Sequence, residues 1–361
     1  MTTGALSMLQ SDARQAAIAA ANPDIGKFGL VRETPRHEKA RRTTDVLRLR
    51  SRDAVAGLWD GQDELLAGLK APQAWIPSKY FYDSLGSKLF EVITYLPEYY
   101  PTRAEAAIFS NHMADIARAV GTGHNLVDLG AGNCEKAASL FGALKPAHYV
   151  AVDISATYLE TALVRLRQQF PDIRMTGLGI DMSAGLCLPD SIPVAQRLFF
   201  YPGSSIGNFT PEDAAVFLSD LRHQCSETGG LLIGVDLIKD KAILDAAYDD
   251  ALGVTAAFNL NVLNNVNCVL GSDFNVRDWR HCGYYNQTLS RAEMHVETLL
   301  AVDVNWPGGS RHFEAGERIH TENSYKYSLE EFGALLRRAG FRNVTSWTDQ
   351  RNWFALFHAT A

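Results

Sequence analysis

Short apolar runs alternate with amphipathic stretches through the middle of the chain. The apolar runs predict strands, and the stretches between them, apolar at every third or fourth position, predict helices. The expected strands are 125–129, 149–154, 173–180, 197–201 and 230–237, and the expected helices are 104–120, 135–144, 156–169 and 211–225. Strands that alternate with helices form βαβ units with right-handed crossovers. The pattern therefore predicts an α/β domain with a doubly wound parallel sheet.

The pattern changes after residue 241 and returns near residue 324. One long helical region is expected over 241–266, and Pro307-Gly308-Gly309 is expected to form a turn. Antiparallel strands are expected at 284–290, 294–303 and 311–315. Near the C-terminal end, Ser328 and Glu331 form a capping box for a helix over 328–339, followed by strands at 343–347 and 353–358.

This interruption predicts three parts of the chain. We expect a Rossmann-like domain from 116–241 and 321–361, and a substrate-binding α+β lobe from 56–115 and 242–320. The remaining residues, 1–55, form an N-terminal extension that is either an arm or a poorly ordered tail.

Composition narrows the choice of partners. The net charge of −7 argues against a general nucleic-acid or anionic-membrane binder, because both need a basic surface. The five cysteines are scattered and odd in number, which fits a reducing compartment. No apolar run reaches the roughly 18 residues of a membrane-spanning helix. We expect a cytoplasmic protein, working as a monomer, with no nucleic-acid or membrane partner.

A glycine-rich turn follows the first strand of the α/β region, in Asp128-Leu129-Gly130-Ala131-Gly132. Glycines let a backbone approach a ligand closely, and the first turn of the next helix leaves amide groups free. Asp153 ends the second strand, where doubly wound folds hold ribose hydroxyls. The turn indicates a nucleotide-like cofactor, with an ordinary strand–helix turn as the alternative.

Three features favour S-adenosylmethionine over a dinucleotide. The position of a third glycine holds Glu135, which disfavours close helix packing over a pyrophosphate. Asp181 follows the third strand, where a carboxylate suits an adenine amino group. The C-terminal order of helix, Ala-Gly-Phe and two strands resembles the closing hairpin of class I methyltransferases. A nicotinamide-dependent oxidoreductase is the main competing enzyme class.

A carboxylate and a hydroxyl stand two residues apart in Glu322-Asn323-Ser324. Side chains on an extended segment alternate, so these two point the same way. Such a pair can hold the two nitrogens of an imidazole ring. A solvated strand end is the alternative explanation.

Several motifs, in order over residues 75–358, jointly resemble one family. It comprises the bacterial L-histidine Nα-methyltransferases of ergothioneine biosynthesis, class I methyltransferases with an extra substrate lobe. The matching segments are 80–83, 86–87, 96–103, 128–132, 135–136, 203–208, 247–250, 253–259 and Glu322-x-Ser324. Departures occur in the glycine loop, where Ala131 and Asn133-Cys134 replace the more usual residues.

The resemblance implies a reaction and a set of site residues. L-histidine and its mono- and dimethyl forms would be methylated on the α-amino group, giving Nα-trimethylhistidine (hercynine). The S-adenosylmethionine site would be lined by Gly130, Lys136, Asp153, Asp181 and Met182. The histidine site would be lined by Tyr99, Gly203, Asn208, Tyr248, Met294, Glu322 and Ser324.

Within that site the resemblance assigns separate tasks. Asn208 and Tyr248 would hold the carboxylate of histidine. Glu322 and Ser324, with Tyr99 nearby, would hold the imidazole ring. Tyr82 is the candidate catalytic residue, close to the reacting amine together with the Gly203 backbone.

The chemistry of methyl transfer agrees with these residue types. The methyl donor is already activated, so we expect no metal, and neither His-x-His nor His-Glu-x-x-His occurs in the sequence. Two further interpretations stay open at this point: a methyltransferase of the same fold acting on another amine, and a non-catalytic binding protein that has kept the fold.

Overall fold

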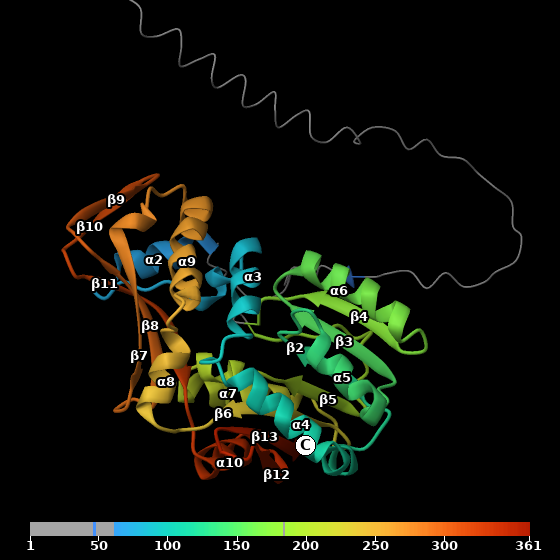
Figure 1. Cartoon of the computed structure of the whole chain (residues 1–361). Helices are drawn as coiled ribbons and strands as arrows, with labels where there is room; N and C mark the ends of the chain where they lie inside the picture. The colour runs from blue at the N-terminus through green and yellow to red at the C-terminus, as the bar shows by residue number, and fades with distance from the viewer. Residues whose placement is uncertain (1–45, 48–60, 183–184) are drawn as a thin grey trace, which may run out of the picture. The chain divides into compact units, whose positions relative to one another are not determined.

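The computed structural model describes residues 46–47, 61–182 and 185–361. Within these ranges the largest sheet has eight strands in the order β1-β4-β3-β2-β5-β6-β13-β12 (Figure 1). Strands β1 to β6 run parallel, and β13 is antiparallel to both of its neighbours. The strands are β1 Val46–Leu47, β2 Asn125–Leu129, β3 His148–Asp153, β4 Arg174–Gly179, β5 Arg197–Tyr201, β6 Gly230–Asp236, β12 Arg342–Thr348 and β13 Phe354–Thr360.

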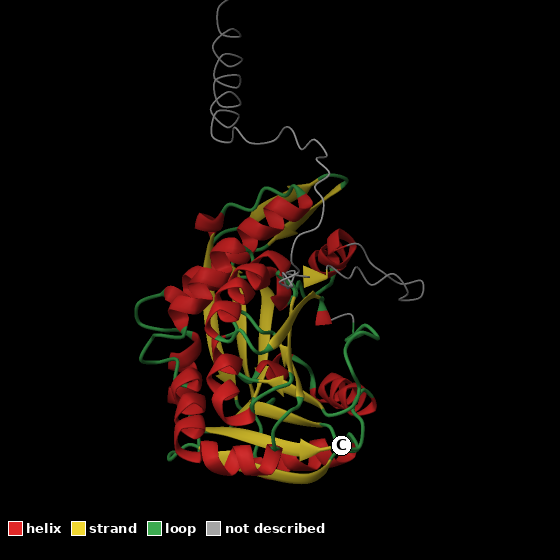
Figure 2. Cartoon of the chain, turned by 90° about the vertical axis from the view of Figure 1, so that its right-hand side faces the viewer, coloured by secondary structure: helices red, strands yellow, loops and turns green. Residues whose placement is uncertain are grey.

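Helices cover both faces of this sheet (Figure 2). One face packs against α4 (Pro101–Val120), α5 (Glu135–Leu144) and α6 (Ala156–Gln169). The other packs against α7 (Pro211–His223) and α10 (Leu329–Arg338). Alternate residues of the central strands belong to different hydrophobic clusters, because successive side chains point to opposite faces. The predicted doubly wound α/β sheet is confirmed.

Most predicted elements of the α/β part are found within a few residues of their expected ends. Helix α4 begins at Pro101, three positions before the predicted start, because proline at the first helical position sacrifices no hydrogen bond. The predicted capping box of α10 is present: Ser328 Oγ accepts from Glu331 N–H, and the Glu331 carboxylate accepts from Ser328 N–H.

The long helical region predicted over 241–266 is found, but it is divided into two parts. Two helices occupy this region, α8 (Lys241–Tyr248) and α9 (Val254–Leu270). Asp249, with φ −146°, leaves the helical conformation after α8, and Gly253, with φ 74°, directly precedes α9. The Asp250 carboxylate then accepts hydrogen bonds from Val254 and Thr255 N–H, which starts α9.

The predicted strand over 294–303 is wrong, because the chain turns in its middle. The exposed residues Leu299 and Leu300 continue the apolar pattern of the strand without belonging to it. Strands β8 and β9 lie on either side, β8 in a three-stranded sheet of order β11-β8-β7 and β9 in a ribbon with β10. The bounds are β7 Trp279–Asn286, β8 Arg291–Thr298, β9 Val302–Trp306, β10 Gly309–Phe313 and β11 Arg318–Tyr325.

Helices α8 and α9 pack against the smaller sheet, and helices from the earlier part of the chain pack on α9. Helices α2 (Gly61–Lys70) and α3 (Ser84–Ile93) and the short η1 (Ser78–Phe81) contact α9. One hydrophobic cluster runs from these helices to the large sheet. The division into a domain of 116–241 plus 321–361 and a lobe of 56–115 plus 242–320 stays a prediction, and β11 spans the proposed boundary at 321.

The N-terminal extension predicted for 1–55 lies outside the described residues, apart from 46–47, which pair with β4. Within the described ranges, no helix is long and apolar enough to cross a bilayer.

Candidate active site

The glycine-rich turn lies between β2 and α5, at the carboxyl edge of the large sheet. Gly130 and Gly132 have φ of 69° and 53°, which favour glycine. The Gly130 N–H donates to Val152 O (2.9 Å), and the Gly132 N–H donates to Asp153 Oδ2 (2.9 Å). A Cβ at Gly130 would meet nothing within 4 Å, so the turn borders open space. This edge can receive a ligand.

Acidic groups from three neighbouring strands face this edge. Asp128 is buried, and its Oδ1 has no hydrogen-bond partner among the described residues. Burial raises the pKa of Asp128 to about 7, although the Tyr149 hydroxyl donates to its Oδ2. Asp153 ends β3, and Asp181 follows β4, where it pairs with Lys79 (3.1 Å). Such an edge fits the hydroxyl and amino groups of an adenosine.

Lys136 connects this edge to a second loop. Its Nζ lies 2.7 Å from Oε2 of Glu105, which is buried on α4. The other oxygen of Glu105 accepts from the Gly203 N–H (2.8 Å), and a Cβ at Gly203 would lie 3.1 Å from Lys136 Nζ. A Cβ built on Gly234 of β6 would overlap the same carboxylate. The glycine turn and the Gly203 loop therefore adjoin.

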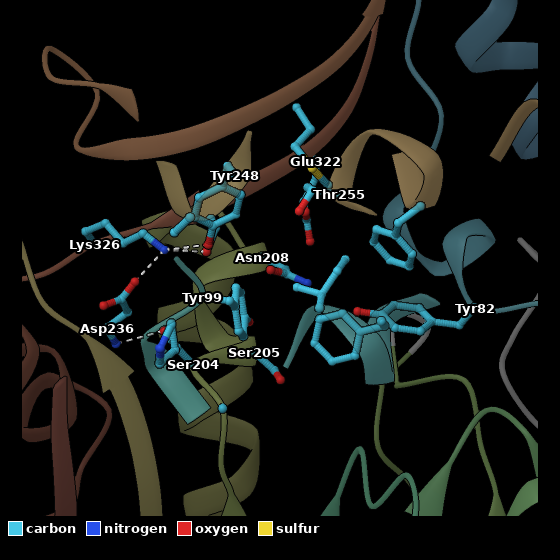
Figure 3. Close-up of a pocket in the computed structure, with 18 residues that line it drawn as sticks. Tyr82, Tyr99, Ser204, Ser205, Asn208, Asp236, Tyr248, Thr255, Glu322 and Lys326 are labelled. Carbon is cyan, nitrogen blue, oxygen red and sulfur yellow. Dashed lines mark hydrogen bonds and ion pairs between the residues drawn. The ribbon is translucent and has the colours of Figure 1, made fainter. Parts of the chain in front are cut away.

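A pocket opens beside Gly203 and gathers all eight residues assigned to histidine or its amine (Figure 3). One follows η1, and one lies in the loop before α4. Two come from the loop after β5 and from η3 (Ser205–Asn208), and one ends α8. The other three lie on β8 and β11. These residues are Tyr82, Tyr99, Gly203, Asn208, Tyr248, Met294, Glu322 and Ser324. The structure brings the set together, and the role of each member stays a prediction.

One wall of the pocket is aromatic. The Tyr82 ring lies 5.7 Å from Phe90 and 5.9 Å from Phe258 between centroids, and Phe90 lies 6.1 Å from Tyr99. Burial raises the pKa of Tyr82 far above its ordinary value, and nearby Glu322 and Asp153 raise it further. The Tyr82 phenol therefore keeps its proton at neutral pH.

The opposite wall contains a buried ionic network. Lys326 Nζ lies 2.8 Å from Asp236 Oδ2, and Lys239 Nζ lies 2.6 Å from Asp236 Oδ1. Lys326 also donates to the Tyr248 hydroxyl (2.7 Å) and to Ser324 Oγ (2.8 Å). The side chains of Lys326 and Lys239 are 0% and 4% exposed. Burial opposes the ionised form of Asp236, but the two lysines outweigh it and lower its pKa.

Glu322 faces the pocket from β11 without a described ion-pair partner of its own. Burial raises its pKa to about 7, and the Lys326 charge limits this rise. Glu322, Ser324 and Lys326 follow one another with period two, so they line the same side of the segment. Glu322 is poised to change its charge near neutral pH.

Sequence reasoning missed several lining residues. Lys326 and Asp236 line the pocket and were not noticed, and Ser204, Ser205 and Thr255 lie in the matching motifs without having been assigned to the site. The period-two spacing from Glu322 was a signal for Lys326, although lysine is rarely buried. The Ser204 hydroxyl accepts from Asp236 N–H (2.9 Å), a contact between distant segments that no local pattern reveals.

The family model described as "Histidine-specific methyltransferase, SAM-dependent" matches residues 61–361. The chain belongs to this family. Membership confirms the predicted class of fold, the enzyme class and S-adenosylmethionine as methyl donor. It contradicts the competing interpretation as a nicotinamide-dependent oxidoreductase.

Curated relatives agree with the family match. The chain is 40% identical to the histidine N-alpha-methyltransferase of Mycolicibacterium smegmatis, over 81% of this chain and 92% of the relative. It is 37% identical to the enzyme of the same name from Mycobacterium tuberculosis, with the same coverage. Ergothioneine biosynthesis protein 1 of Neurospora crassa is 34% identical over 76% of this chain and 32% of its own length.

The described residues fit the methyl donor of this family. The glycine turn, Asp153 and Asp181 border one open edge, and Met182 next to Asp181 packs against the sheet. Lys136 also lies there, although its ammonium pairs with Glu105. The five residues assigned to S-adenosylmethionine thus follow β2, β3 and β4, and their individual contacts with it stay predictions.

Proposed function

We propose that this protein transfers methyl groups from S-adenosylmethionine to the α-amino nitrogen of L-histidine, as far as Nα-trimethylhistidine. The reaction is the first step of ergothioneine biosynthesis. The observation that carries the proposal is the pocket of Figure 3, in which eight residues from distant segments meet beside the glycine turn. The family and the names of the relatives support the same substrate.

The proposed pose divides the pocket between the two ends of histidine. Asn208 and Tyr248 hold the carboxylate, and Glu322 and Ser324 hold the imidazole ring. Figure 3 shows Asn208, Tyr248 and Glu322 around a shared space. Tyr99 lies near the ring, and Met294 pairs with Glu322 across the β8–β11 ladder. The α-amine then lies on the side of Tyr82 and Gly203, which is the side of the cofactor edge.

S-adenosylmethionine supplies an activated methyl group on a sulfonium centre. The protein's task is to place the amine in line with that group, and such positioning is worth roughly 7–11 kcal/mol. Gly130, Asp153, Asp181 and Met182 would hold the donor at the sheet edge, and Lys136 would face its carboxylate.

The amine must be unprotonated when it reacts, whereas an α-amino group has a pKa of about 8. The sulfonium charge of the donor and the buried Lys326 ammonium both disfavour another cation beside them. Tyr82 keeps its own proton, so it orients the amine by hydrogen bonding and does not act as a base; the proton released with each methyl transfer leaves to water.

Successive transfers end in a quaternary ammonium group that has no proton to donate. The faces of Tyr82, Phe90 and Tyr99 provide an environment that can hold such a cation without hydrogen bonds. The same wall accepts the mono- and dimethyl forms, so the growing product remains bound at one place.

The test is a survey of substrates. The purified protein is incubated with S-adenosylmethionine and each of the twenty amino acids in turn, and methylation is followed by mass spectrometry. We expect three methyl groups on histidine and no comparable product from the others. A folded protein that leaves histidine unmodified would refute the proposal, and methylation of another amine would identify a related enzyme instead.

We also propose that the enzyme acts as a monomer without a metal. All residues assigned to the site come from one chain, and the transferred methyl group is already activated. Full activity after treatment with a chelator, in a fraction that sedimentation shows to be monomeric, is the expected result. Loss of activity that is restored by a metal ion would contradict it.

A further inference from the structure

The buried Lys326 ammonium determines which way two pocket hydroxyls donate. An ammonium group has three N–H donors and no acceptor. Those of Lys326 have three oxygen partners: Asp236 Oδ2, the Tyr248 hydroxyl and Ser324 Oγ, at 2.7–2.8 Å. Both hydroxyl oxygens must therefore accept from Lys326.

Each hydroxyl then has its own hydrogen left to donate. Within the part of the chain that the structure describes, neither the Tyr248 hydroxyl nor Ser324 Oγ has a second protein partner. Both residues line the pocket. Their hydrogens are thus available to a ligand, and a ligand atom that meets them needs a lone pair.

Glu322 presents the opposite requirement. Its carboxylate is an acceptor when ionised, and it lies two residues before Ser324 on the same side of β11. A neutral imidazole has one N–H donor and one nitrogen lone pair, whereas an imidazolium has two donors and no lone pair. A neutral ring therefore satisfies both Glu322 and the Ser324 hydrogen, whereas an imidazolium would leave that hydrogen without an acceptor on the ring.

We propose that Lys326 is a positioning residue that fixes Ser324 and Tyr248 as hydrogen-bond donors, so that the pocket binds histidine with a neutral imidazole in a single tautomer. Glu322 accepts from the ring N–H, Ser324 donates to the other ring nitrogen, and Tyr248 donates to the carboxylate. This inference rests on the proposed function, because it concerns how that site recognises histidine.

The charges around the ring act in opposite directions. Glu322 alone would favour an imidazolium, because an ion pair would form. Lys326 and Lys239 outnumber Asp236, and their excess positive charge disfavours an imidazolium. The other titratable groups of the pocket and its network are Tyr82, Tyr99, Tyr100 and Tyr248. Burial raises the pKa of all four tyrosines, so they stay uncharged over the range of the test.

The direct test is the protonation of the bound ring. L-histidine labelled with ¹⁵N in the ring is bound together with S-adenosylhomocysteine, which prevents turnover, and the ring nitrogen shifts are followed from about pH 8 down to pH 5.5. A free histidine side chain titrates near pH 6.5. In the wild-type complex we expect one protonated and one unprotonated nitrogen down to about one unit below that value.

Three variants distinguish a positioning role from a purely structural one. In Lys326→Met and Ser324→Ala we expect the bound ring to take up its second proton near the pH of free histidine, and the histidine KM to rise about tenfold. Lys239→Met is the matched control, since it removes the other buried ammonium on Asp236 but none that contacts the pocket hydroxyls. Because Ser324 and Tyr248 keep their donor in this variant, the ring titration should stay closer to the wild type than in Lys326→Met, and the KM should change less than twofold.

The outcomes separate this inference from the proposed function. A doubly protonated ring in the wild-type complex at neutral pH would overturn the inference while histidine methylation stands. Unchanged ring titration in Ser324→Ala would do the same, and this variant carries the test even where Lys326→Met does not fold. If histidine neither binds nor is methylated by the folded wild-type protein, the proposed function itself fails.

Discussion

The Asp236 carboxylate pairs with two buried lysines, Lys239 and Lys326, and the effect of its charge can be tested by Asp236→Asn. The substitution keeps the shape of the side chain and one acceptor oxygen. It removes the carboxylate with which the structure pairs both Lys326 and Lys239. The Tyr100 hydroxyl, which donates to Asp236 at 2.8 Å, also loses its charged acceptor.

The expected cost follows from this burial. Removing one partner of a buried ion pair typically destabilises a protein by about 3–5 kcal/mol. Asp236 is 1% exposed and has two such partners, so we expect a loss in this range near pH 7. This is a large part of the roughly 5–15 kcal/mol that stabilises an ordinary domain.

The loss should shrink as the pH rises. In the wild-type protein the pairing with Asp236 raises the pKa of Lys326, so its stabilising charge persists beyond the ordinary lysine range. Without Asp236, we expect burial to lower the pKa of Lys326 in the folded state below its value in the unfolded state. As the pH rises, Lys326 therefore loses its proton in the folded state before it does so in the unfolded state. Stability then rises with pH wherever the unfolded state binds more protons than the folded one. Lys239, whose pKa burial already lowers to about 8, behaves in this way in both proteins.

Urea unfolding monitored by circular dichroism, near pH 7 and again near pH 9, measures both effects. Asp115→Asn is the control, because it breaks the Arg118–Asp115 pair on the surface, whose side chains are 77% and 54% exposed. The control should lose less than about 1 kcal/mol. A loss below 1 kcal/mol for Asp236→Asn, or a loss equally large at both pH values, would refute this account of the network.

Three further predictions concern histidine binding. Glu322→Ala should raise the histidine KM about 10- to 100-fold, because a charged hydrogen bond is lost. The affinity for S-adenosylhomocysteine, measured by calorimetry, should stay nearly intact. An equal loss of both affinities would contradict the assigned role. Because burial raises the pKa of Glu322 to about 7 and its ionised form is the acceptor, kcat/KM for histidine should increase through that pH, and Glu322→Gln should abolish this part of the profile. In Gly207→Ala, the new Cβ would lie 2.8 Å from Tyr325 O and 3.3 Å from Ser324 Oγ, so the histidine KM should rise several-fold. Gly142→Ala is the control. Its new Cβ would meet nothing within 4 Å, so this variant should bind histidine like the wild type.

The α/β part of the fold could be predicted because its signals are local. Each strand of the parallel sheet from β2 to β6 is a short apolar run, and the helices between them keep a clear period. The exposed residues Leu299 and Leu300 extended the apolar pattern of β8 past a turn, so one strand was predicted where two occur. The break between α8 and α9, at Asp250 and Gly253, was overlooked because the surrounding sequence is mostly apolar. Apolar patterning records burial well, but it marks chain reversals poorly.

Only part of the candidate site could be predicted from the sequence. Its residues were found through motifs that resemble a family, and the structure brings them to one pocket. Lys326 was missed because a buried lysine needs a buried carboxylate, and Asp236 lies far away in sequence on β6. Contacts between charged groups of distant segments depend on the folded arrangement, which hydropathy does not encode.

The crowding between Glu105 and Gly234 has a consequence for how this family can vary. A methyl group at position 234 would meet the Glu105 carboxylate and also the Phe354 ring. A lineage can therefore acquire a side chain at 234 only after residue 105 has shortened and ring 354 has moved. Such a lineage would lose the connection that the Glu105 carboxylate makes between the Lys136 ammonium and the Gly203 N–H. We expect positions 105, 234 and 354 to change together. Their joint substitution would identify a group of relatives in which other contacts align the substrate with the methyl donor.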